Sequence, residues 1–475
     1  MKALNNVEHF IVLMQENRSF DHLLGFMQSP EYPIDGLRGD ESNPGNPNDA
    51  SSPRYTVSND ANRGDPPLDP GHSFNPASIT QMFGLSKEAR QKLSRLPDTE
   101  PTNNGYVYDY QQRIGGRPED AMKCFAPANL PVLTTLAREF AVCDKWFSSV
   151  PGATCPNRRF AHAATSEGYL GGTQKTTEAR TIFEVLKARG LSAAIYYHDV
   201  PQSLTFTKLL GKQFFKPIQR FWVDLEKGTL PNYVFIEPRY LNWPGFPAND
   251  QHPSNDMQEG EKLIASLYNA VRKSPLWEKS ALIITYDEAG GTYDHVPPPR
   301  TVKPDANSGA DDDEDGKYIA FDFDRLGFRV PAVVVSPLIP RMTIDSRVHD
   351  HTAILALVEK RFGLPHLTER DKWAGENDLS TLFSLTQART DTPVKVMPAA
   401  SSEVQFHAQA ASLNDLQVEL VESAESLVEH DAALAQLRQR AITERNQIDA
   451  ANYLSEVMRR AGIESEASPP PHDGP

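Results

Sequence analysis

The sequence predicts an α/β protein with a mostly parallel central sheet, followed by a C-terminal helical extension. Short apolar runs alternate with helix-like segments along the first 385 residues, as expected for a sheet covered by helices on both faces. Two of the runs, 10–14 and 281–286, are long and mostly apolar, which is typical of central strands buried on both sides. From about residue 386 the pattern changes to helical periodicity with charged residues between the apolar ones.

The strands are expected where apolar runs end at polar or turn residues. The predicted strands are 9–14, 193–197, 233–236, 281–286 and 330–335. The predicted helices of the same region are 156–164, 181–189, 259–273 and 352–362. Pro156 suits the first turn of its helix, because proline has no N–H group to leave unsatisfied there.

Three segments are predicted to be irregular, because they are rich in Pro, Gly, Asn and Asp: 27–78, 239–256 and 303–317. The first is expected to end at the ligand crevice. The third contains the acidic run 311–316, which superficially resembles a calcium loop. It lacks the alternating ligand spacing of such loops, so a solvated loop is favoured.

The change of pattern near residue 386 divides the chain into four predicted parts: a main domain (1–385), a linker (386–412), a helical extension (413–465) and a disordered tail (466–475). Two helices are expected in the extension, over 413–440 and 442–461. Packing on the main domain is the simplest role for them. Covering the crevice, docking on a membrane, or forming an oligomer are the alternatives.

Bulk properties exclude several classes of function. The net charge of −15 argues against non-specific nucleic-acid binding and against docking on anionic membranes. No stretch is long and apolar enough for a transmembrane segment. The three cysteines leave at least one unpaired and do not form a disulfide framework. The N-terminus has no signal-peptide pattern, so a cytoplasmic location is expected, with export by a specialised secretion route as the alternative.

Pairs of polar residues directly follow the two most apolar strands: Glu16 and Asn17 follow the first, and Asp287 and Glu288 follow the fourth. The carboxyl ends of such strands line the ligand crevice of open α/β sheets. Carboxylates gathered at one edge repel one another, and a cation relieves that repulsion. The pattern therefore predicts a metal site or a phosphate-processing site.

The same stretches resemble the signature blocks of a known family. Glu-Asn-Arg-Ser-Phe-Asp-His (16–22) and Tyr-Asp-Glu-Ala-Gly-Gly-Thr-Tyr-Asp-His-Val-Pro-Pro-Pro (286–299) are similar to motifs of the bacterial phospholipase C and acid phosphatase family of phosphoesterases. Plant non-specific phospholipases C belong to the same family. The resemblance covers residues 7 to about 384 and implies an alkaline-phosphatase-like sandwich.

The resemblance also implies a nucleophile, Thr154, which precedes a Pro-Asn-Arg block (156–158). Independently, Thr154 lies just before a predicted helix N-terminus, whose N–H groups and dipole favour a phosphoryl group. The alternative is that Thr154 only caps the N-terminus of the helix and has no catalytic role. Cys155 is the rival nucleophile, because a thiolate at a helix N-terminus is activated.

Three histidines match family positions around the phosphate: His72, His198 and His252. Histidine suits leaving-group protonation and charge stabilisation near neutral pH. His252 and His198 are the favoured proton donors.

Other polar residues have open roles. His22, His295 and His351 are equally compatible with structural roles. Arg18 and Arg158 are expected to clamp phosphate or to pair with the site carboxylates. Gly290 and Gly291 are expected to let the backbone turn tightly beside the metal.

A divalent metal is expected on Glu16, Asn17, Asp287 and Glu288, with Thr154 completing the shell. It would activate the threonine hydroxyl, which is otherwise a poor nucleophile. Zn²⁺ is favoured, and Mn²⁺ and Ca²⁺ are alternatives.

The predicted function is a phospholipase C that cleaves phospholipids through a phosphothreonine intermediate, with phosphatidylcholine favoured and transient membrane contact implied. Aromatic residues at the crevice mouth would favour choline. The candidates are Trp222, Trp243, Tyr240, Phe246 and Tyr106. A broad acid phosphatase is the alternative. A catalytically inactive binding protein is disfavoured because all five predicted metal and nucleophile residues are present. A sulfatase is disfavoured because residues 155–158 do not match the motif Cys-x-Pro-x-Arg.

Overall fold

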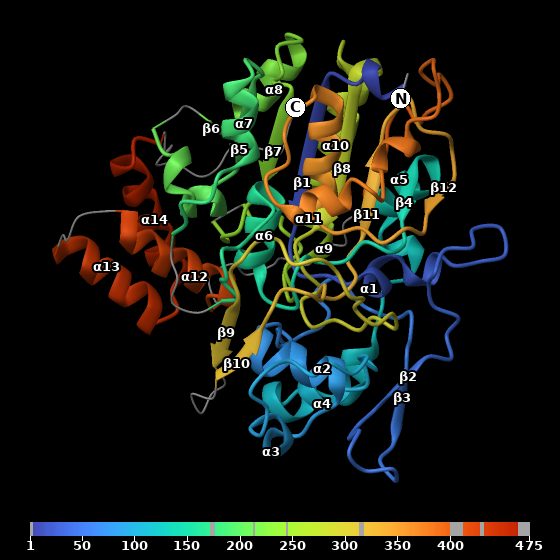
Figure 1. Cartoon of the computed structure of the whole chain (residues 1–475), viewed down its shortest axis with the longest axis vertical. Coiled ribbons are helices and arrows are strands. Elements are labelled where there is room, and N and C mark those ends of the chain that lie inside the picture. Colours follow the sequence, from blue (N-terminus) through green and yellow to red (C-terminus); the bar gives the residue numbers. More distant parts are fainter. Residues whose placement is uncertain are drawn as a thin grey trace.

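The computed structural model describes residues 3–171, 176–211, 214–243, 246–312, 318–399, 412–427 and 432–463. Within these ranges an eight-stranded sheet has the order β12-β4-β11-β8-β1-β7-β5-β6 (Figure 1). Its strands are β1 (His9–Gln15), β4 (Ala141–Cys143), β5 (Ala193–Tyr197), β6 (Phe215–Pro217), β7 (Tyr233–Glu237), β8 (Ser280–Tyr286), β11 (Ala332–Val335) and β12 (Thr343–Asp345).

The sheet confirms the predicted α/β architecture. Every pairing is parallel except those of β11, which runs antiparallel to both β8 and β4. All residues of β1, β7 and β8 are buried, as their continuous apolar runs predict. After β8 the chain stays at the carboxyl edge of the sheet. β11 therefore starts at that edge and runs antiparallel to its neighbours β8 and β4. Ser336, which follows β11, therefore lies at the edge opposite Glu16 and Asp287.

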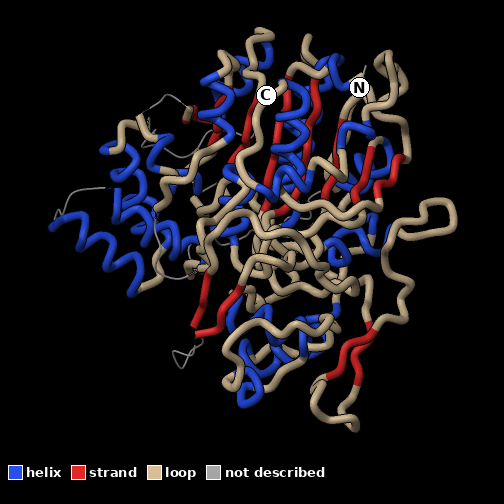
Figure 2. Tube along the Cα trace, in the orientation of Figure 1, coloured by secondary structure: helices blue, strands red, loops and turns tan. Residues whose placement is uncertain are grey.

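Helices cover both faces of this sheet (Figure 2). On one face α10 packs on α6, and α6 packs on α7; on the other α9 packs on α5 and α8. These helices are α5 (Pro131–Glu139), α6 (Thr154–Ala163), α7 (Ile182–Ala188), α8 (Ile218–Glu226), α9 (Met257–Lys273) and α10 (Thr352–Phe362), with α11 (Glu369–Ala374) following α10.

The carboxyl edge of the sheet faces a loop-rich lobe with its own apolar cluster, which includes Phe74, Phe160 and Phe321 (Figure 1). Its elements are α1 (Phe20–Leu24), α2 (Ile79–Phe83), α3 (Lys87–Arg90), α4 (Tyr106–Asp109) and the hairpins β2 (Ser42–Pro44) with β3 (Arg54–Thr56) and β9 (Gly309–Asp312) with β10 (Tyr318–Phe321). Two predicted irregular segments thus each contain strands, because hairpin pairing is not visible in loop-like composition. Residues 313–316 of the acidic run lie outside the described residues.

Within its described residues, 413–427 and 432–463, the extension contains three α-helices where two helices were predicted: α12 (Asp415–Ala424), α13 (Ala432–Thr443) and α14 (Gln447–Arg460). The expected 413–440 helix is therefore wrong, since α12 ends at Ala424 and passes into a 3-10 turn at 425–427. Apolar residues of these helices share one buried cluster with Tyr197, Leu204 and Leu241 of the main domain.

The described part of the predicted linker, 386–399, is bonded to the main domain. Tyr268 donates a hydrogen bond to the backbone oxygen of Pro393 (2.6 Å), and Val396 N–H donates to Asn269 (2.8 Å). The rest of the linker, 400–411, and the predicted tail lie outside the described residues. In the part of the chain that is described, no helix combines the length and apolarity needed to cross a membrane.

Candidate active site

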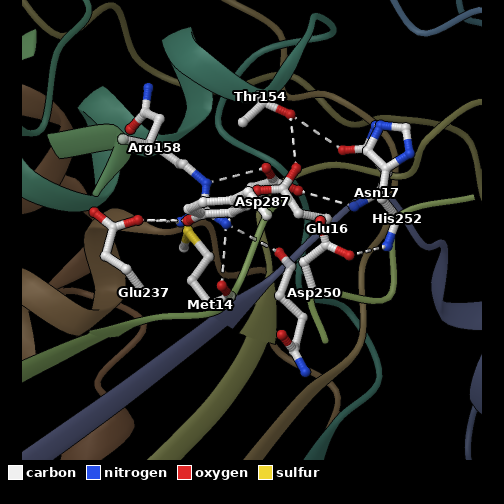
Figure 3. Close-up of polar contacts among 12 residues, drawn as sticks. Met14, Glu16, Asn17, Thr154, Arg158, Glu237, Asp250, His252 and Asp287 are labelled. Carbon is white, nitrogen blue, oxygen red and sulfur yellow. Dashed lines mark hydrogen bonds and ion pairs between the residues drawn. The ribbon is translucent and has the colours of Figure 1, made fainter. Parts of the chain in front are cut away.

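The register of β1 against β8 builds the floor of the site. Gln15 is the partner of Tyr286, so Glu16 and Asn17 emerge opposite Asp287 and Glu288. All four side chains are buried, and the view in Figure 3 shows Glu16, Asn17 and Asp287 converging below Thr154. The four residues that the sequence assigned to a metal site therefore do share one edge of the sheet.

Thr154 is the first residue of α6, and its hydroxyl lies over this floor. Its Oγ1 is 3.0 Å from Glu16 Oε2 and 3.1 Å from Asn17 Oδ1, so its one proton is donated to either acceptor (Figure 3). The capping position belongs to Ala153, which makes no side-chain bond. Thr154 is therefore not a helix cap, and its hydroxyl points into the site.

Cys155 is placed less favourably for nucleophilic attack. Its Sγ accepts a hydrogen bond from Gln202 Nε2 (2.8 Å), and burial raises the pKa of the thiol well above its ordinary value. The neutral thiol is a weak nucleophile, which favours Thr154.

Two backbone features bring Asn17 to the hydroxyl. Asn17 itself has φ 55°, a left-handed conformation that asparagine tolerates better than most residues. Gly290 (φ 59°) packs against it so closely that a Cβ atom would lie 2.2 Å from the Asn17 carbonyl oxygen. The tight turn expected at Gly290 is present, and it adjoins Asn17.

Arg158, one turn along α6, binds the outer oxygens of the site carboxylates. Its guanidinium donates to Glu16 Oε1 (2.5 Å), to Asp287 Oδ2 (3.2 Å) and, more weakly, to Glu237 Oε2 (3.5 Å). Of its two expected roles, the structure shows the pairing with carboxylates. Arg18 instead donates to the backbone oxygens of Gln251 (2.7 Å) and Asp65 (2.6 Å).

The donor set fits a divalent cation. Burial, more than any other cause, raises the pKa of Glu16 well above its ordinary value, and it raises the pKa of Glu288 to about 8 despite the nearby His72. Glu288 Oε1 is buried without a hydrogen-bond partner among the described residues. If all of these carboxylates were ionised, Arg158 alone would leave surplus negative charge, and an oxygen-seeking metal ion would stabilise the ionised forms.

A hydrogen-bonded chain links Thr154 to His252. Asn17 Oδ1 faces the Thr154 hydroxyl, and Asn17 Nδ2 donates to His252 Nε2 (3.0 Å). His252 Nδ1 lies 3.2 Å from the carbonyl oxygen of Pro253, which assigns the ring proton to Nδ1. His72 lies next to His252, with ring centroids 6.0 Å apart.

His198 occupies a different place. It follows β5, two strands from β1, and its Nδ1 lies 2.9 Å from the backbone oxygen of Glu237. The structure thus brings His72 and His252 together near Thr154, and it places His198 beside the strand that carries Glu237.

The three histidines with open roles serve the framework. His351 Nε2 donates to the backbone oxygen of Asp287 (2.6 Å), while its Nδ1 accepts from Trp146 (3.2 Å), so it positions Asp287. His22 packs edge-on against Phe125, and burial lowers its pKa well below the ordinary value. His295 pairs with Asp21 and Asp35 in a separate network.

Sequence reasoning missed two supporting acids. Asp250 accepts hydrogen bonds from the backbone N–H of His252 (3.1 Å) and from Asn255 (2.8 Å), while its backbone oxygen accepts from Glu16 (2.9 Å). Glu237 accepts from Ser203 (2.6 Å) as well as from Arg158. The available signals were the position of Asp250 two residues before His252, and of Glu237 at the end of a buried strand.

A cavity of about 670 Å³ opens beside the nucleophile, since its lining includes Ala153 and His72. None of the five aromatic residues expected at the crevice mouth lines it, so that expectation is wrong. Tyr240 lies under Arg158 (5.4 Å), Tyr106 packs on Tyr293, and Phe246 lies under Arg239. Trp222 packs on Phe221, and Trp243 packs against the apolar cluster of the extension.

Comparison with known proteins identifies the family of the chain. Residues 7–365 match the model of the phosphoesterase family. Non-specific phospholipase C1 of Arabidopsis thaliana is 39% identical over 90% of this chain and 80% of its own length. Non-specific phospholipase C3 of the same plant is 36% identical over 97% of this chain and 90% of its own length.

More distant relatives include phospholipase C B of Mycobacterium tuberculosis, 29% identical over 80% of this chain and 78% of its own length. Among solved structures, a protein of the alkaline phosphatase superfamily from Vibrio parahaemolyticus covers 62% of this chain and 80% of that chain, with 12% identity and a TM-score of 0.34. That score is too low to carry an argument, and the α/β fold rests on the sheet described above. The family match and the plant relatives span most of the chain, which therefore belongs to the phosphoesterase family.

Proposed function

We propose that the chain is a phospholipase C that hydrolyses phospholipids, with phosphatidylcholine favoured, to diacylglycerol and a phosphorylated head group. The observation that carries this proposal is the Thr154 hydroxyl, which lies at the start of α6 between Glu16 and Asn17, next to Ala153 in the wall of a cavity. The relatives named as phospholipases C support the reaction class.

The residues of the site perform the first step as follows. Glu16 Oε2, 3.0 Å from Thr154 Oγ1, takes the hydroxyl proton as the oxygen attacks phosphorus. The N–H groups at the start of α6 and the helix dipole stabilise the developing negative charge on the phosphoryl oxygens. The products of this step are a phosphothreonine ester and diacylglycerol.

Histidine completes the proton transfers. His252 lies beside Asn17 and His72. In its imidazolium form, which gives up the hydrogen bond from Asn17, its Nε2 proton passes to the departing diacylglycerol oxygen. The neutral ring then accepts a proton from the water that hydrolyses the phosphothreonine, and Glu16 returns its proton to Thr154 Oγ1. A divalent cation held by Glu16, Asn17, Asp287, Glu288 and Thr154 would lower the pKa of the hydroxyl and neutralise phosphoryl charge. Zn²⁺ is the favoured ion, with Mn²⁺ and Ca²⁺ as alternatives.

Contact with a membrane is the remaining part of the proposal. Leu68 lines the cavity and is 44% exposed, beside Pro67. An apolar residue at this rim suits brief insertion among lipids while a substrate molecule enters.

The second candidate is an acid phosphatase acting on soluble monoesters. Its support is the polar part of the cavity lining, which includes Ser73, Asn75, Arg113, Ser412 and Asn414. Both candidates use the same nucleophile.

A paired assay separates them. Wild type and Thr154→Ala are given phosphatidylcholine in mixed micelles and an aryl phosphate, before and after chelation, and then with Zn²⁺, Mn²⁺ or Ca²⁺ restored. We expect diacylglycerol release that is lost in the chelated protein and reduced by at least about a thousandfold in the variant. Monoester cleavage without diacylglycerol would establish the phosphatase, and near-normal turnover by the variant would disprove the role of Thr154.

A further inference from the structure

The C-terminal extension contributes one wall of the cavity beside Thr154. Leu413, Glu419 and Arg445 line it from this side, and Asp69 and His72 line it from the main domain. Figure 1 shows the extension lying against one side of the main body. A segment far from the nucleophile in sequence therefore lies where a substrate would sit.

Glu419, on α12, is anchored beside the nucleophile. Its carboxylate accepts a short hydrogen bond from the Tyr169 hydroxyl, and the guanidinium of Arg159 lies over the same ring at 4.3 Å. Burial raises the pKa of Glu419, while hydrogen bonds from Tyr169 and Cys155 and the charge of His72 oppose the rise. The carboxylate thus interacts with both the residue after Thr154 and a histidine of the site.

Asp69 supplies a second carboxylate to the same cavity. Its Oδ2 is 3.9 Å from His252 Nε2. Its Oδ1 is buried and accepts no hydrogen bond from the residues described. This oxygen has acceptor capacity that the folded chain leaves unused.

The two arginines of the lining are committed to other partners. Arg113 lies 3.4 Å from Asp109, and Arg445 Nε donates to the backbone oxygen of Leu413 (2.9 Å). Arg113 is thus paired with a carboxylate, and Arg445 is held against the backbone of Leu413. The carboxylates of Asp69 and Glu419 line the cavity next to Thr154. This environment suits a positively charged head group that is linked through an ester oxygen to the phosphorus under attack.

We propose that Glu419 and Asp69 bind the cationic head group of the phospholipid, so that the extension sets head-group preference. The ligand class is an ammonium or quaternary ammonium linked to the phosphate, as in ethanolamine and choline phospholipids. This inference rests on the proposed phospholipase C reaction and names its substrate class.

The test is Glu419→Gln, because glutamine keeps a carbonyl oxygen to accept from Tyr169 and loses only the charge. The value of kcat/KM is measured for phosphatidylcholine, phosphatidylethanolamine and the anionic phosphatidylglycerol in the same detergent micelles. We expect the ratio of phosphatidylcholine to phosphatidylglycerol kcat/KM to fall at least about tenfold, and the ethanolamine ratio to fall similarly. Glu422→Gln, on the same helix and outside the cavity lining, is the matched control and should leave both ratios unchanged.

A binding measurement makes the inference independent of lipid turnover. Phosphocholine and inorganic phosphate are titrated into Thr154→Ala protein with and without Glu419→Gln. We expect phosphocholine to bind more tightly than phosphate only when Glu419 is present. An equal fall in kcat/KM for all three lipids, or equal binding of the two ligands, would overturn the proposal and leave Glu419 a positioning residue. If wild type releases no diacylglycerol but phosphocholine still depends on Glu419, the phospholipase reaction fails and the cationic subsite stands.

Discussion

Two buried clusters in this molecule are built from the same two sequence blocks, and each is centred on one arginine. In the active site Arg158 binds Glu16, Asp287 and Glu237. In the second cluster Arg329 binds Asp21 (2.8 Å) and Asp294 (3.0 Å), which lie further along the same two blocks. Both arginines are fully buried.

The second cluster is balanced in charge. His295 lies between Asp21 (2.6 Å) and Asp35 (3.3 Å), and these carboxylates raise its pKa to about 10 against the opposing effect of burial. It is therefore protonated at neutral pH. Lys145, 3.8 Å from Asp35, adds another positive charge. Although Asp21, Asp294 and His295 lie close enough to hold a metal ion, their oxygens already have cationic partners.

The active site lacks this balance, because Glu16, Asp287, Glu237 and Glu288 in their ionised forms exceed the single positive charge of Arg158. The difference teaches that acidic residues and histidine in a buried cluster do not by themselves mark a catalytic centre. Surplus negative charge beside a cavity distinguishes the centre at Thr154 from the network at Arg329.

The largest effect is expected when each arginine is removed, which tests whether the two clusters differ in their need for a cation. Arg158→Leu and Arg329→Leu should each lower the free energy of unfolding by about 3–5 kcal/mol, because each strands buried carboxylates. Added Zn²⁺ should restore much of the loss only in Arg158→Leu, where a cation can replace the guanidinium. Thermal unfolding with chelator or with Zn²⁺ measures this, and equal recovery in both variants would contradict the distinction.

A smaller effect is expected from Gly290→Ala. The left-handed φ costs about 1–2 kcal/mol, and the new Cβ, 2.2 Å from the Asn17 oxygen, must displace Asn17. We expect kcat to fall about a hundredfold, as for other small displacements of catalytic groups. Gly363→Ala is the control, since its φ is 64° with no atom within 4 Å of the added Cβ. Its kcat should be unchanged while it loses some stability, and a normal kcat for Gly290→Ala would refute the role of this contact.

The pH dependence of stability should report the balanced network. The folded-state pKa of His295 is about 10, above an unfolded value of about 6.5. The folded state therefore binds the proton more tightly, so the contribution is full below pH 6.5 and is lost as pH rises through 10. Urea unfolding at pH 6, 8 and 10 should show a steeper decline for wild type than for His295→Gln. Parallel curves would show that this ion pair adds nothing, and solvent screening limits its size because His295 is 25% exposed.

The smallest effect is expected at Ser19, between the two clusters. Its hydroxyl accepts from the N–H of His22 (3.1 Å) at the start of α1 and donates to the Tyr293 oxygen (2.6 Å). Ser19→Ala should cost about 1 kcal/mol of unfolding free energy, as for other helix caps, with kcat within about twofold of wild type. A large loss of activity would mean that the two clusters are coupled through this residue.

Much of the fold was predictable because its signals are local. The apolar runs of β1 and β8 identify central strands, and their ends place Glu16 and Asp287 at one edge. The reversal of β11 was not predictable, since strand direction depends on where the preceding 45 or so residues return to the sheet. The break after Ala424 was missed because the apolar spacing continues through it.

The site was predictable to the extent that its residues follow strands or lie in motifs. Thr154, Glu16, Asn17 and His252 meet as expected. The cavity lining was not predictable, because Tyr240 and Trp243 are aromatic residues whose burial depends on tertiary packing. Glu419 carries no local signal at all, since only the packing of α12 brings it near Thr154.

The position of Glu419 also has a consequence for biosynthesis. Glu419 lines the cavity and is hydrogen-bonded to Tyr169, which lies 250 residues earlier in the chain. At about 5–20 residues per second, a ribosome needs about 10–50 s to make the segment between them. During that interval the nascent chain contains Thr154 without the wall of the cavity that α12 supplies. The cavity is therefore complete only after α12 has been translated.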